Sequence, residues 1–255
     1  MTYRYPFGQP LIPVVQKDRS PKKVFVLGVY ASAVHAKWRD KYGTVLVQAL
    51  AVASEPYIFW RGDGVEGIIN RIEIPHVAGR LEPAAAHFNG PSGKTLDDSF
   101  LSPLGYSRED AWLSDLLPES RINPNQRKAI KKHYDPLIGK LDLPACTIPD
   151  FSGSELRQHP DRHLEILKEV EESRANTIVL LGDLPIKHWL SHFSKYRKLS
   201  DFGETTDTYG KRHTLEINGR TYQILPLVHP RQAGSLGRAS KKWTELHTAW
   251  VSAAT

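Results

Sequence analysis

The sequence contains a single cysteine, Cys146, among its 255 residues. One thiol excludes a disulfide framework within the chain, and it excludes any zinc or iron–sulfur site made of cysteines alone. We therefore predict that Cys146 is a small buried hydrophobic residue, and that the protein holds no iron–sulfur cluster.

Long hydrophobic runs are also missing. No apolar run approaches the ~18 residues that cross a bilayer, and residues 1–13 lack the basic and then apolar layout of a signal peptide. These absences predict a cytoplasmic protein with no membrane partner. A hydrophobic content of 40% is typical of a globular chain, and we expect a single domain over residues 1–255.

Acidic residues are scarce near the end of the chain. Residues 187–255 hold 11 Lys and Arg against 5 Asp and Glu, so this segment carries the whole net charge of +6 and the preceding 186 residues sum to zero. A basic C-terminal quarter favours a polyanionic partner such as DNA.

Three short apolar runs predict buried parallel strands, at residues 24–29, 177–181 and 222–228. Residues 45–52 fit a strand or a helix equally well. Apolar residues at helical spacing predict helices around residues 164–170, 186–193 and 243–250. Alternating strands and helices indicate an α/β fold with a mainly parallel sheet. Ligands of such folds bind at the carboxyl ends of strands, which directs attention to residues 28–32, 182–183 and 229–231.

Residues 54–91 are irregular and rich in Gly, Pro and His, as in a loop-rich insertion. Residues 90–95 resemble the end of a phosphate-binding P-loop, but Phe88 stands where that motif needs its first glycine, and residues 81–87 do not read as the preceding strand. We therefore disfavour a nucleotide hydrolase. Two His-x-x-x-His pairs, His159/His163 and His188/His192, have metal-ligand spacing without a third ligand, and we predict no metal.

His229 is the most suggestive single residue, because it follows a predicted strand directly. A histidine there can donate a hydrogen bond to negative charge that develops on a substrate, while Pro230 fixes the turn. An equally good interpretation is that His229 only caps the next helix.

Taken in order, these segments resemble the motifs of the uracil-DNA glycosylase superfamily, especially its families 4 and 5. Residues 24–31 are similar to the strand before the first motif, and residues 88–94 resemble the stretch whose Phe stacks on the flipped base. Residues 111–118 and 121–124 resemble the strand and turn that read the base. Residues 177–189 and 225–231 look like the last two motifs, the second of which contains His-Pro. The resemblance extends over residues 24–250.

The resemblance implies a three-layer α/β/α fold around a central, mainly parallel four-stranded sheet. It also implies an enzyme that binds double-stranded DNA as a monomer, flips one nucleotide and hydrolyses its N-glycosidic bond without a cofactor. His229 would stabilise the oxygen of the leaving base. The base pocket would be formed by Gly28, Ala31, Ser32, Phe88, Asn89 and Asp115. The contacts to the DNA stack and phosphates would come from Arg231, Gln232, Arg238, Lys241 and Lys242.

The departures from the family pattern bear on the chemistry. The first motif lacks the acid or amide that positions water, and Tyr30 stands near its place. We expect Tyr30 with Ser32 to orient the water, or a carboxylate to do so from elsewhere in the chain. The candidate carboxylates are Glu55, Asp63, Glu82 and Asp115.

Asp115 stands where the family has the Asn that reads uracil. A carboxylate accepts from the N4 amino group of cytosine, and a protonated carboxyl can also donate to N3. The expected substrate is therefore a modified cytosine, since excision of ordinary cytosine would damage the host genome. A polar wall in the irregular segment could bind a sugar, as in bacterial antiphage glycosylases that remove glucosylated hydroxymethylcytosine. Its residues would be Trp60, Arg61, Asp63, Glu66, Asn70 and His76.

Two other functions remain open at this stage. The first is a repair glycosylase for uracil or a damaged base. The second is a non-catalytic nucleic-acid-binding module on the same fold.

Overall fold

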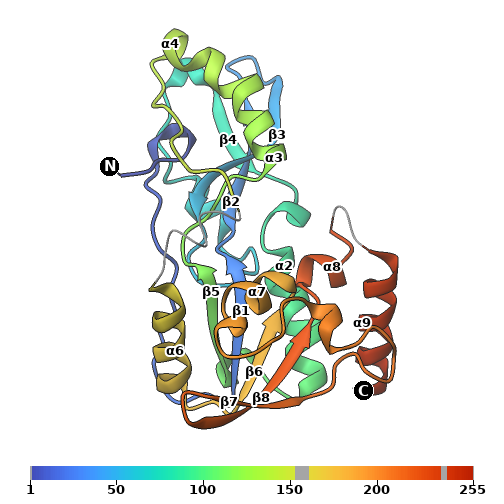
Figure 1. The fold of residues 1–255 in the computed structure, drawn as a ribbon. Coiled ribbons are helices and arrows are strands. Elements are labelled where there is room, and N and C mark those ends of the chain that lie inside the picture. Colours follow the sequence, from blue (N-terminus) through green and yellow to red (C-terminus); the bar gives the residue numbers. More distant parts are fainter. Residues whose placement is uncertain (1, 153–160, 237–239, 255) are drawn as a thin grey trace. The chain divides into compact units, whose positions relative to one another are not determined.

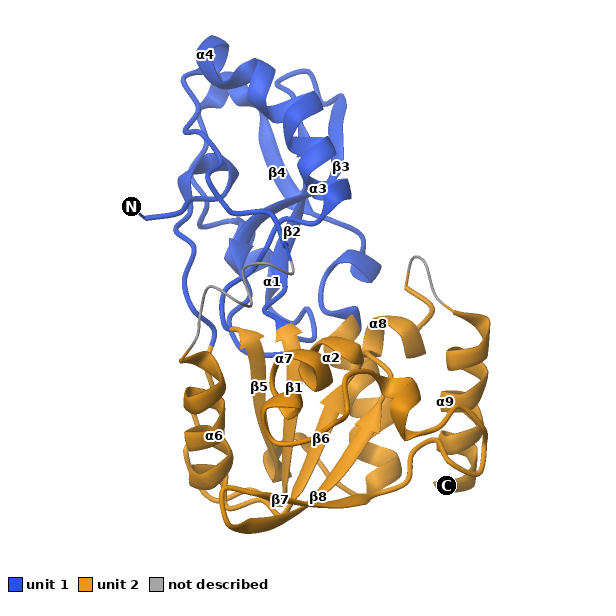
Figure 2. Cartoon of the chain, in the orientation of Figure 1, with its two compact units in different colours: residues 1–14, 30–91, 118–152 blue, residues 15–29, 92–117, 153–255 orange. Residues whose placement is uncertain are grey.

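The computed structural model describes residues 2–152, 161–236 and 240–254. The chain forms two compact units, each built from three stretches of sequence (Figure 2). Unit 1 comprises residues 1–14, 30–91 and 118–152, and unit 2 comprises residues 15–29, 92–117 and 153–255. The irregular segment 54–91 falls entirely within unit 1.

Unit 2 is built around a five-stranded sheet of order β5-β1-β6-β8-β7 (Figure 1). The strands are β1 (Val24–Tyr30), β5 (Ala111–Leu117), β6 (Thr177–Leu181), β7 (His213–Ile217) and β8 (Arg220–Leu227). β6 pairs in parallel with both β1 and β8. β5 follows the direction of β1, because Lys23 N–H donates to the carbonyl of Asp110 at their starts and Val29 N–H donates to the Asp115 carboxyl near their ends.

The three predicted strands are confirmed as β1, β6 and β8. Every residue of β5 and β6 is buried, as is β1 up to Val29, and strands covered on both faces read as continuous apolar runs. The predicted four-stranded sheet is wrong by one strand. β7 pairs antiparallel with β8 through the turn Asn218–Gly219, where both residues have positive φ values of 51° and 75°, as in a tight hairpin.

Helices lie on both faces of this sheet, so the α/β prediction is confirmed (Figure 1). The predicted helices around 164–170 and 243–250 are α6 (Arg162–Ser173) and α9 (Lys241–Ala254). The third is shorter than expected, since α7 (Asp183–His188) stops before Trp189 and a separate turn, Leu190–His192, follows. Two further helices of the described residues are α2 (Pro91–Leu96), continued by the π-helix Asp97–Leu101 and the 3-10 helix Ser102–Leu104, and α8 (Pro230–Ala233).

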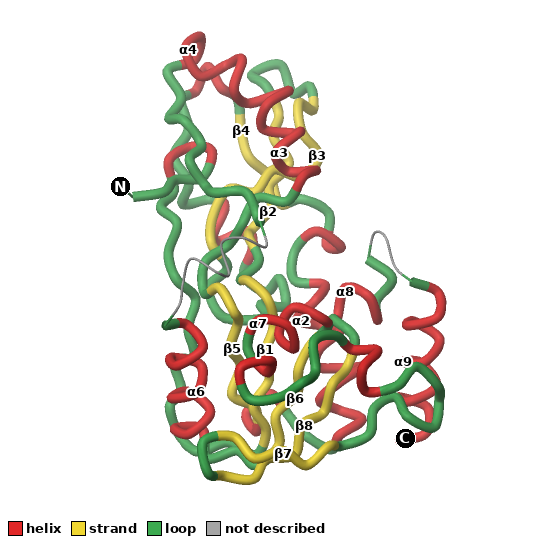
Figure 3. The backbone as a smooth tube through the Cα atoms, viewed as in Figure 1, coloured by secondary structure: helices red, strands yellow, loops and turns green. Residues whose placement is uncertain are grey.

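Unit 1 contains a three-stranded antiparallel sheet of order β3-β2-β4 (Figure 3). Its strands are β2 (Ala33–Arg39), β3 (Val45–Ser54) and β4 (Arg80–Pro83), so the ambiguous run at 45–52 is a strand. Its helices are α1 (Val65–Ile69), α3 (Pro124–Ala129), which continues through Ile130–Tyr134, and α4 (Ile138–Leu141).

Aromatic rings fill the core of unit 1. Phe7 packs edge-on against Trp38 and Tyr134 at centroid distances of 5.2 and 5.1 Å. Cys146 is partly buried against the same cluster, and its burial raises the pKa of the thiol. Within the described ranges, no helix has the length and hydrophobicity to traverse a lipid bilayer.

Candidate active site

His229 lies two residues after the end of β8 and caps the N-terminus of α8. Its Nδ1 accepts a hydrogen bond from the backbone N–H of Arg231 at 3.1 Å. An accepting nitrogen carries no proton, so the neutral ring carries its proton on Nε2. The two interpretations of His229 are therefore compatible, because the cap fixes the tautomer that leaves Nε2–H as a donor.

His229 is neutral at physiological pH. Burial lowers the pKa of its imidazole to about 4, and the nearby charge of Arg231 acts in the same direction. The end of β6 packs closely against it, since a Cβ placed on Gly182 would lie 3.4 Å from the Cβ of His229. The N–H of Gly182 donates to the carbonyl of Leu227 at 2.7 Å, which joins the ends of β6 and β8. Glycine is favoured at this position because its φ is +85°, a left-handed conformation that other residues rarely adopt.

A buried polar relay holds the backbone just before His229. Tyr209 accepts from the N–H of Val228 at 3.1 Å and contacts Nδ1 of His247 at 2.7 Å. Nε2 of His247 donates to the carbonyl of Ser99 at 3.0 Å, so Nδ1 is the acceptor for the Tyr209 hydroxyl. Burial lowers the pKa of His247 to about 4, which keeps the relay in this protonation state.

Asp115 is buried in β5, with 4% of its surface exposed. Burial raises the pKa of its carboxyl to about 7. The positive charge of Arg162 and the N–H of Val29 lower the pKa, while Glu169 raises it, and burial outweighs the others. Both the neutral acid and the carboxylate are thus populated near pH 7.

Arg162, at the start of α6, clamps the strand at Asp115. Its Nη2 donates to the carbonyl of Asp115 at 2.7 Å and to the hydroxyl of Ser114 at 3.2 Å. Its Nη1 lies 3.0 Å from carboxylate oxygens of Glu165 and Glu169. The two acids offset the arginine charge, which explains why Arg162 does not hold the pKa of Asp115 in the ordinary range.

Asp115 lies on β5 and His229 lies two residues beyond the end of β8, and these are the two outer strands of the parallel part of the sheet. Three strand spacings separate these strands, or about 14 Å between strand axes. Gly28 is buried in β1, between β5 and β6. Gly28, Asp115 and His229 of the predicted site therefore all belong to unit 2, on its sheet or just beyond a strand end.

The other predicted pocket residues belong to unit 1. Tyr30 packs its ring against Phe151 at a centroid distance of 4.9 Å. Ala31 is buried, and Ser32 is exposed with its carbonyl accepting from the hydroxyl of Ser120.

Phe88 and Asn89 occupy a tight turn of unit 1. Phe88 is 37% exposed beside His87, whereas Asn89 is 2% exposed. The amide of Asn89 accepts from the N–H of His35 at 2.8 Å and donates to its carbonyl at 3.0 Å. The adjacent Gly90 crosses so closely that a Cβ there would lie 2.1 Å from the backbone of Arg61. The structure thus gives Asn89 a backbone-bracing role.

Most of the residues predicted to contact DNA form hydrogen bonds or ion pairs with other residues of unit 2. The amide of Gln232 bonds to the backbone of Ser240 and to the hydroxyl of Thr244, each at 2.8 Å. Lys242 pairs with Glu204, and the largely exposed Lys241 lies 3.7 Å from Glu245. Arg231 is exposed, although its Nε donates to the carbonyl of Leu236 at 2.9 Å. Arg238 lies outside the described residues.

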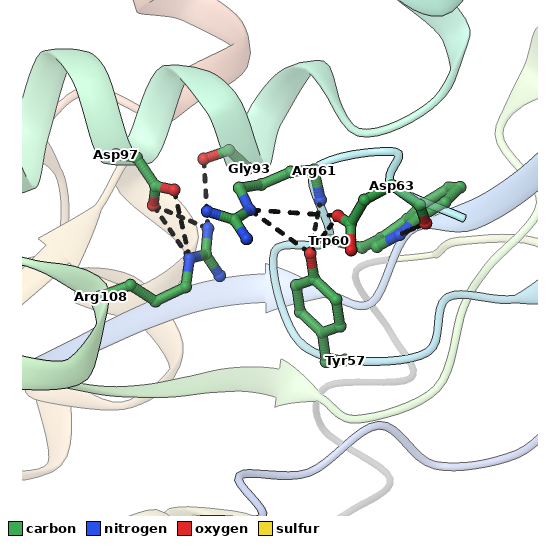
Figure 4. A network of polar contacts seen from close by, with 7 residues as sticks. All are labelled: Tyr57, Trp60, Arg61, Asp63, Gly93, Asp97 and Arg108. Atoms are coloured by element: carbon green, nitrogen blue, oxygen red, sulfur yellow. Dashed lines mark hydrogen bonds and ion pairs between the residues drawn. The ribbon is translucent and has the colours of Figure 1, made fainter. Parts of the chain in front are cut away.

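The other candidate carboxylates for water activation belong to unit 1. Glu55 is buried directly after β3. Glu82 forms ion pairs with Arg39 and Arg80, both at 2.9 Å. The exposed Asp63 accepts from the hydroxyl of Tyr57 (Figure 4).

The prediction that Trp60 belongs to a sugar-binding wall is wrong, because Trp60 is buried. Its side chain is 1% exposed within the core of unit 1, and its Nε1 donates to the carbonyl of Asp63 at 2.9 Å (Figure 4). A ring buried in this way has no free face for a sugar. Arg61, Asp63, Glu66, Asn70 and His76 remain at the surface.

The P-loop interpretation is excluded by geometry. Residues 91–96 form helix α2, whose Gly93 carbonyl accepts from Arg108 at 3.3 Å while Arg108 also pairs with Asp97 at 2.7 Å (Figure 4). A strand does precede this segment, contrary to the sequence prediction, but β4 is antiparallel and belongs to the sheet of unit 1. A P-loop requires a parallel strand leading straight into a glycine loop.

The described histidines of these pairs do not converge on a metal site. His163 and His192 stack with parallel rings at a centroid distance of 4.2 Å, which is a packing geometry rather than a chelating one. His159 lies outside the described residues. Among residues 2–152, 161–236 and 240–254, no three His, Cys, Asp or Glu side chains converge as metal ligands.

No model of a known protein family matches the chain, and no curated protein sequence is significantly similar to it.

Proposed function

We propose that the chain is a DNA glycosylase that hydrolyses the N-glycosidic bond of a modified cytosine at the carboxyl edge of the sheet of unit 2. One observation carries the proposal: two proton donors, the buried Asp115 of β5 and the partly exposed His229 just after β8, lie at the two outer strands of the parallel part of the sheet. β1 and β6 lie between these strands, and a base bound over their carboxyl ends would lie between the two donors.

His229 is suited to stabilise the leaving base at O2. Its Nε2–H is fixed as a donor by the cap contact with Arg231, and its low pKa keeps the ring neutral. A preorganised donor strengthens its hydrogen bond as negative charge grows on O2, which stabilises the transition state more than the bound substrate.

Asp115 is suited to act as a general acid on cytosine. A pKa of about 7 leaves a proton available near neutral pH. The N3 of cytosine has a free lone pair and can take this proton, whereas the N3 of uracil already carries one. As the bond between the sugar and N1 breaks, the proton passes from Asp115 to N3 and the base departs neutral.

Water completes the reaction on the sugar. The departing base leaves an oxocarbenium-like sugar, which water attacks at the same carbon. The water proton replaces the one that Asp115 gave to the base. Asp115 therefore turns over without a metal or an organic cofactor, and the products are the free base and an abasic site.

Excision must be restricted to a modified base, because ordinary cytosine fits the same two donors. A bulky substituent, such as the glucose of glucosylated 5-hydroxymethylcytosine, would distinguish the substrate base from ordinary cytosine. We therefore infer that the substrate is phage DNA that carries this base. The enzyme would then act in antiviral defence.

Excision from matched duplexes tests the proposal. The duplexes contain uracil, cytosine, 5-hydroxymethylcytosine or its glucosylated form at one position, and abasic sites are detected by alkaline cleavage. We expect cleavage only of the modified-cytosine strands. Excision of uracil alone would instead favour a repair glycosylase. Tight, salt-sensitive DNA binding with no excision would favour a non-catalytic module.

Two variants separate the roles of the donors. His229→Ala should lower the excision rate by about 100-fold, the typical effect of one oxyanion donor. His192→Ala, which removes an exposed imidazole from the same unit, is the matched control and should retain the wild-type rate. Equal rates for the two variants would remove His229 from the reaction.

Asp115→Asn keeps a hydrogen-bonding group of the same size but has no acidic proton. We expect it to lose excision of modified cytosine and to leave any activity on uracil intact. In the wild type, excision should decline as the pH rises above about 7, because Asp115 loses its proton there. A rate on modified cytosine that is unchanged between pH 6 and 9 contradicts this role.

A further inference from the structure

Unit 1 exposes a row of lysines on one helix. Helix α3 and its continuation to Tyr134 carry Lys128, Lys131 and Lys132, all exposed. Among the described residues, none of the three is within ion-pair distance of an acid. The neighbouring Arg127 differs, because it pairs with Asp150 at 2.7 Å.

The helix is held so that these lysines point away from the core. Gln126 bonds to the free edge of β3, accepting from the N–H of Ala51 at 3.0 Å and donating to the carbonyl of Ala49 at 3.2 Å. Ile130 and Tyr134 are fully buried on the same side. Residues 130–134 form a π-helical turn, and the three lysines lie between the buried positions, on the exposed side of the helix.

The helix runs along β3 toward the turn that joins β2 to β3. The start of the helix contacts Ala49 and Ala51 of β3 through Gln126. The end of the helix contacts Trp38 of β2, because the ring of Tyr134 lies 5.8 Å from the ring of Trp38. Trp38 pairs with Val47, near the beginning of β3. The last lysines of the row therefore lie at the same end of unit 1 as the turn.

That turn presents an aromatic ring to solvent on a rigid support. Tyr42 is 82% exposed, the largest exposure among the bulky hydrophobic side chains of the described residues. Asp40 braces the turn, because its Oδ1 accepts from the N–H groups of Tyr42 and Thr44 at 2.9 and 2.8 Å. Lys41 lies 5.0 Å over the Tyr42 ring. A cation and an open aromatic face are the two groups that bind phosphates and bases.

We propose that Lys41, Tyr42, Lys128, Lys131 and Lys132 form a nucleic-acid-binding surface on unit 1. The helix lysines neutralise backbone phosphates, and Tyr42 stacks on a base that is not paired. The surface rests on the proposed function in one respect, namely that DNA is the polyanion. It is distinct from the C-terminal lysines predicted for this role, since Lys241 and Lys242 face Glu245 and Glu204.

Salt-dependent binding of the full chain to unmodified duplex DNA tests the lysines. Each phosphate contact adds about 0.9 to the slope of log affinity against log salt concentration, so the triple variant K128Q/K131Q/K132Q should lower that slope by about 2.7. The control K17Q/K23Q/K168Q makes the same charge change at exposed positions of unit 2 outside the basic segment 187–255. Equal slopes for the two triple variants would overturn the proposal.

Tyr42 is tested on the same duplex with a short single-stranded gap. Loss of one stacked base predicts about tenfold weaker binding for Tyr42→Ala, while Tyr42→Phe keeps the ring and should bind as the wild type does. Wild-type binding by Tyr42→Ala would remove stacking from the proposal.

Neither assay requires excision, so the surface can be established even if the glycosylase proposal fails. Vesicles of phosphatidylserine provide the competing polyanion. Lysine-dependent binding to these vesicles without binding to DNA would assign the surface to a membrane instead.

Discussion

At the scale of single residues, the site is governed by groups whose burial shifts their pKa. Desolvation disfavours the charged form of both groups, so it raises the pKa of the Asp115 carboxyl and lowers the pKa of the His229 imidazole. Perturbed groups of this kind gather where chemistry is done. Neither shift follows from the sequence, because burial depends on which strands become neighbours.

Tyr209→Phe tests the relay that holds His229. The change leaves the N–H of Val228 and Nδ1 of His247 buried without their hydrogen-bond partner, which should destabilise the fold by about 1–3 kcal/mol. Chemical denaturation measures this loss. Tyr222→Phe is the matched control, since the buried Tyr222 hydroxyl has no hydrogen-bond partner among the described residues. If both variants lose the same stability, the relay contributes nothing specific.

At the scale of elements, burial decides what the sequence reveals. β1 and β6 are predictable because strands covered on both faces are apolar throughout, and β8 because its buried second half, residues 224–227, is apolar. β7 alternates exposed and partly buried residues and was missed, although its Asn218–Gly219 turn is a strong hairpin signal. His229 was predictable from its place after a strand. The contacts of Asn89 and Tyr209 were not, since their partners are distant in sequence.

The clamp between α6 and β5 gives a prediction at this scale. Arg162→Met removes a positive charge that lowers the pKa of Asp115, so that pKa should rise and the alkaline limb of excision should move to higher pH. The variant should also be less stable, because the carbonyl of Asp115 and the carboxylate of Glu169 lose their donor. A pH–rate profile separates the change in the pKa of Asp115 from the loss of stability. A variant that only disturbs packing lowers the excision rate without moving the alkaline limb of the profile.

At the scale of the whole molecule, the chain passes five times between its two units, so neither is a continuous segment of sequence. The composition of the irregular stretch 54–91 predicts a loop-rich insertion. In the structure this stretch shares its unit with residues 118–152 and with the N-terminus. Contacts between such distant stretches leave no periodic pattern in the sequence.

The buried titratable groups together predict how stability depends on pH. His35, His229 and His247 each have a pKa lowered to about 4, so the unfolded chain binds more protons than the native one between about pH 4 and 6.5. Their contribution is present above pH 6.5 and is lost on acidification. Asp115 acts oppositely, because its raised pKa makes the native state bind the extra proton between about pH 4 and 7.

Three histidines outweigh one carboxyl, so stability should rise with pH up to about 6.5 and then flatten or fall slightly as Asp115 ionises. Removing the ionisable group in Asp115→Asn should steepen the acid limb and remove the decline, leaving the variant more stable than the wild type at pH 8. The free energy involved is roughly 4 kcal/mol for a shift of this size. Calorimetric melting across pH 5–8.5 measures both limbs. An Asp115→Asn profile parallel to that of the wild type would mean that the Asp115 carboxyl ionises with an ordinary pKa, and the general-acid role would fail with it.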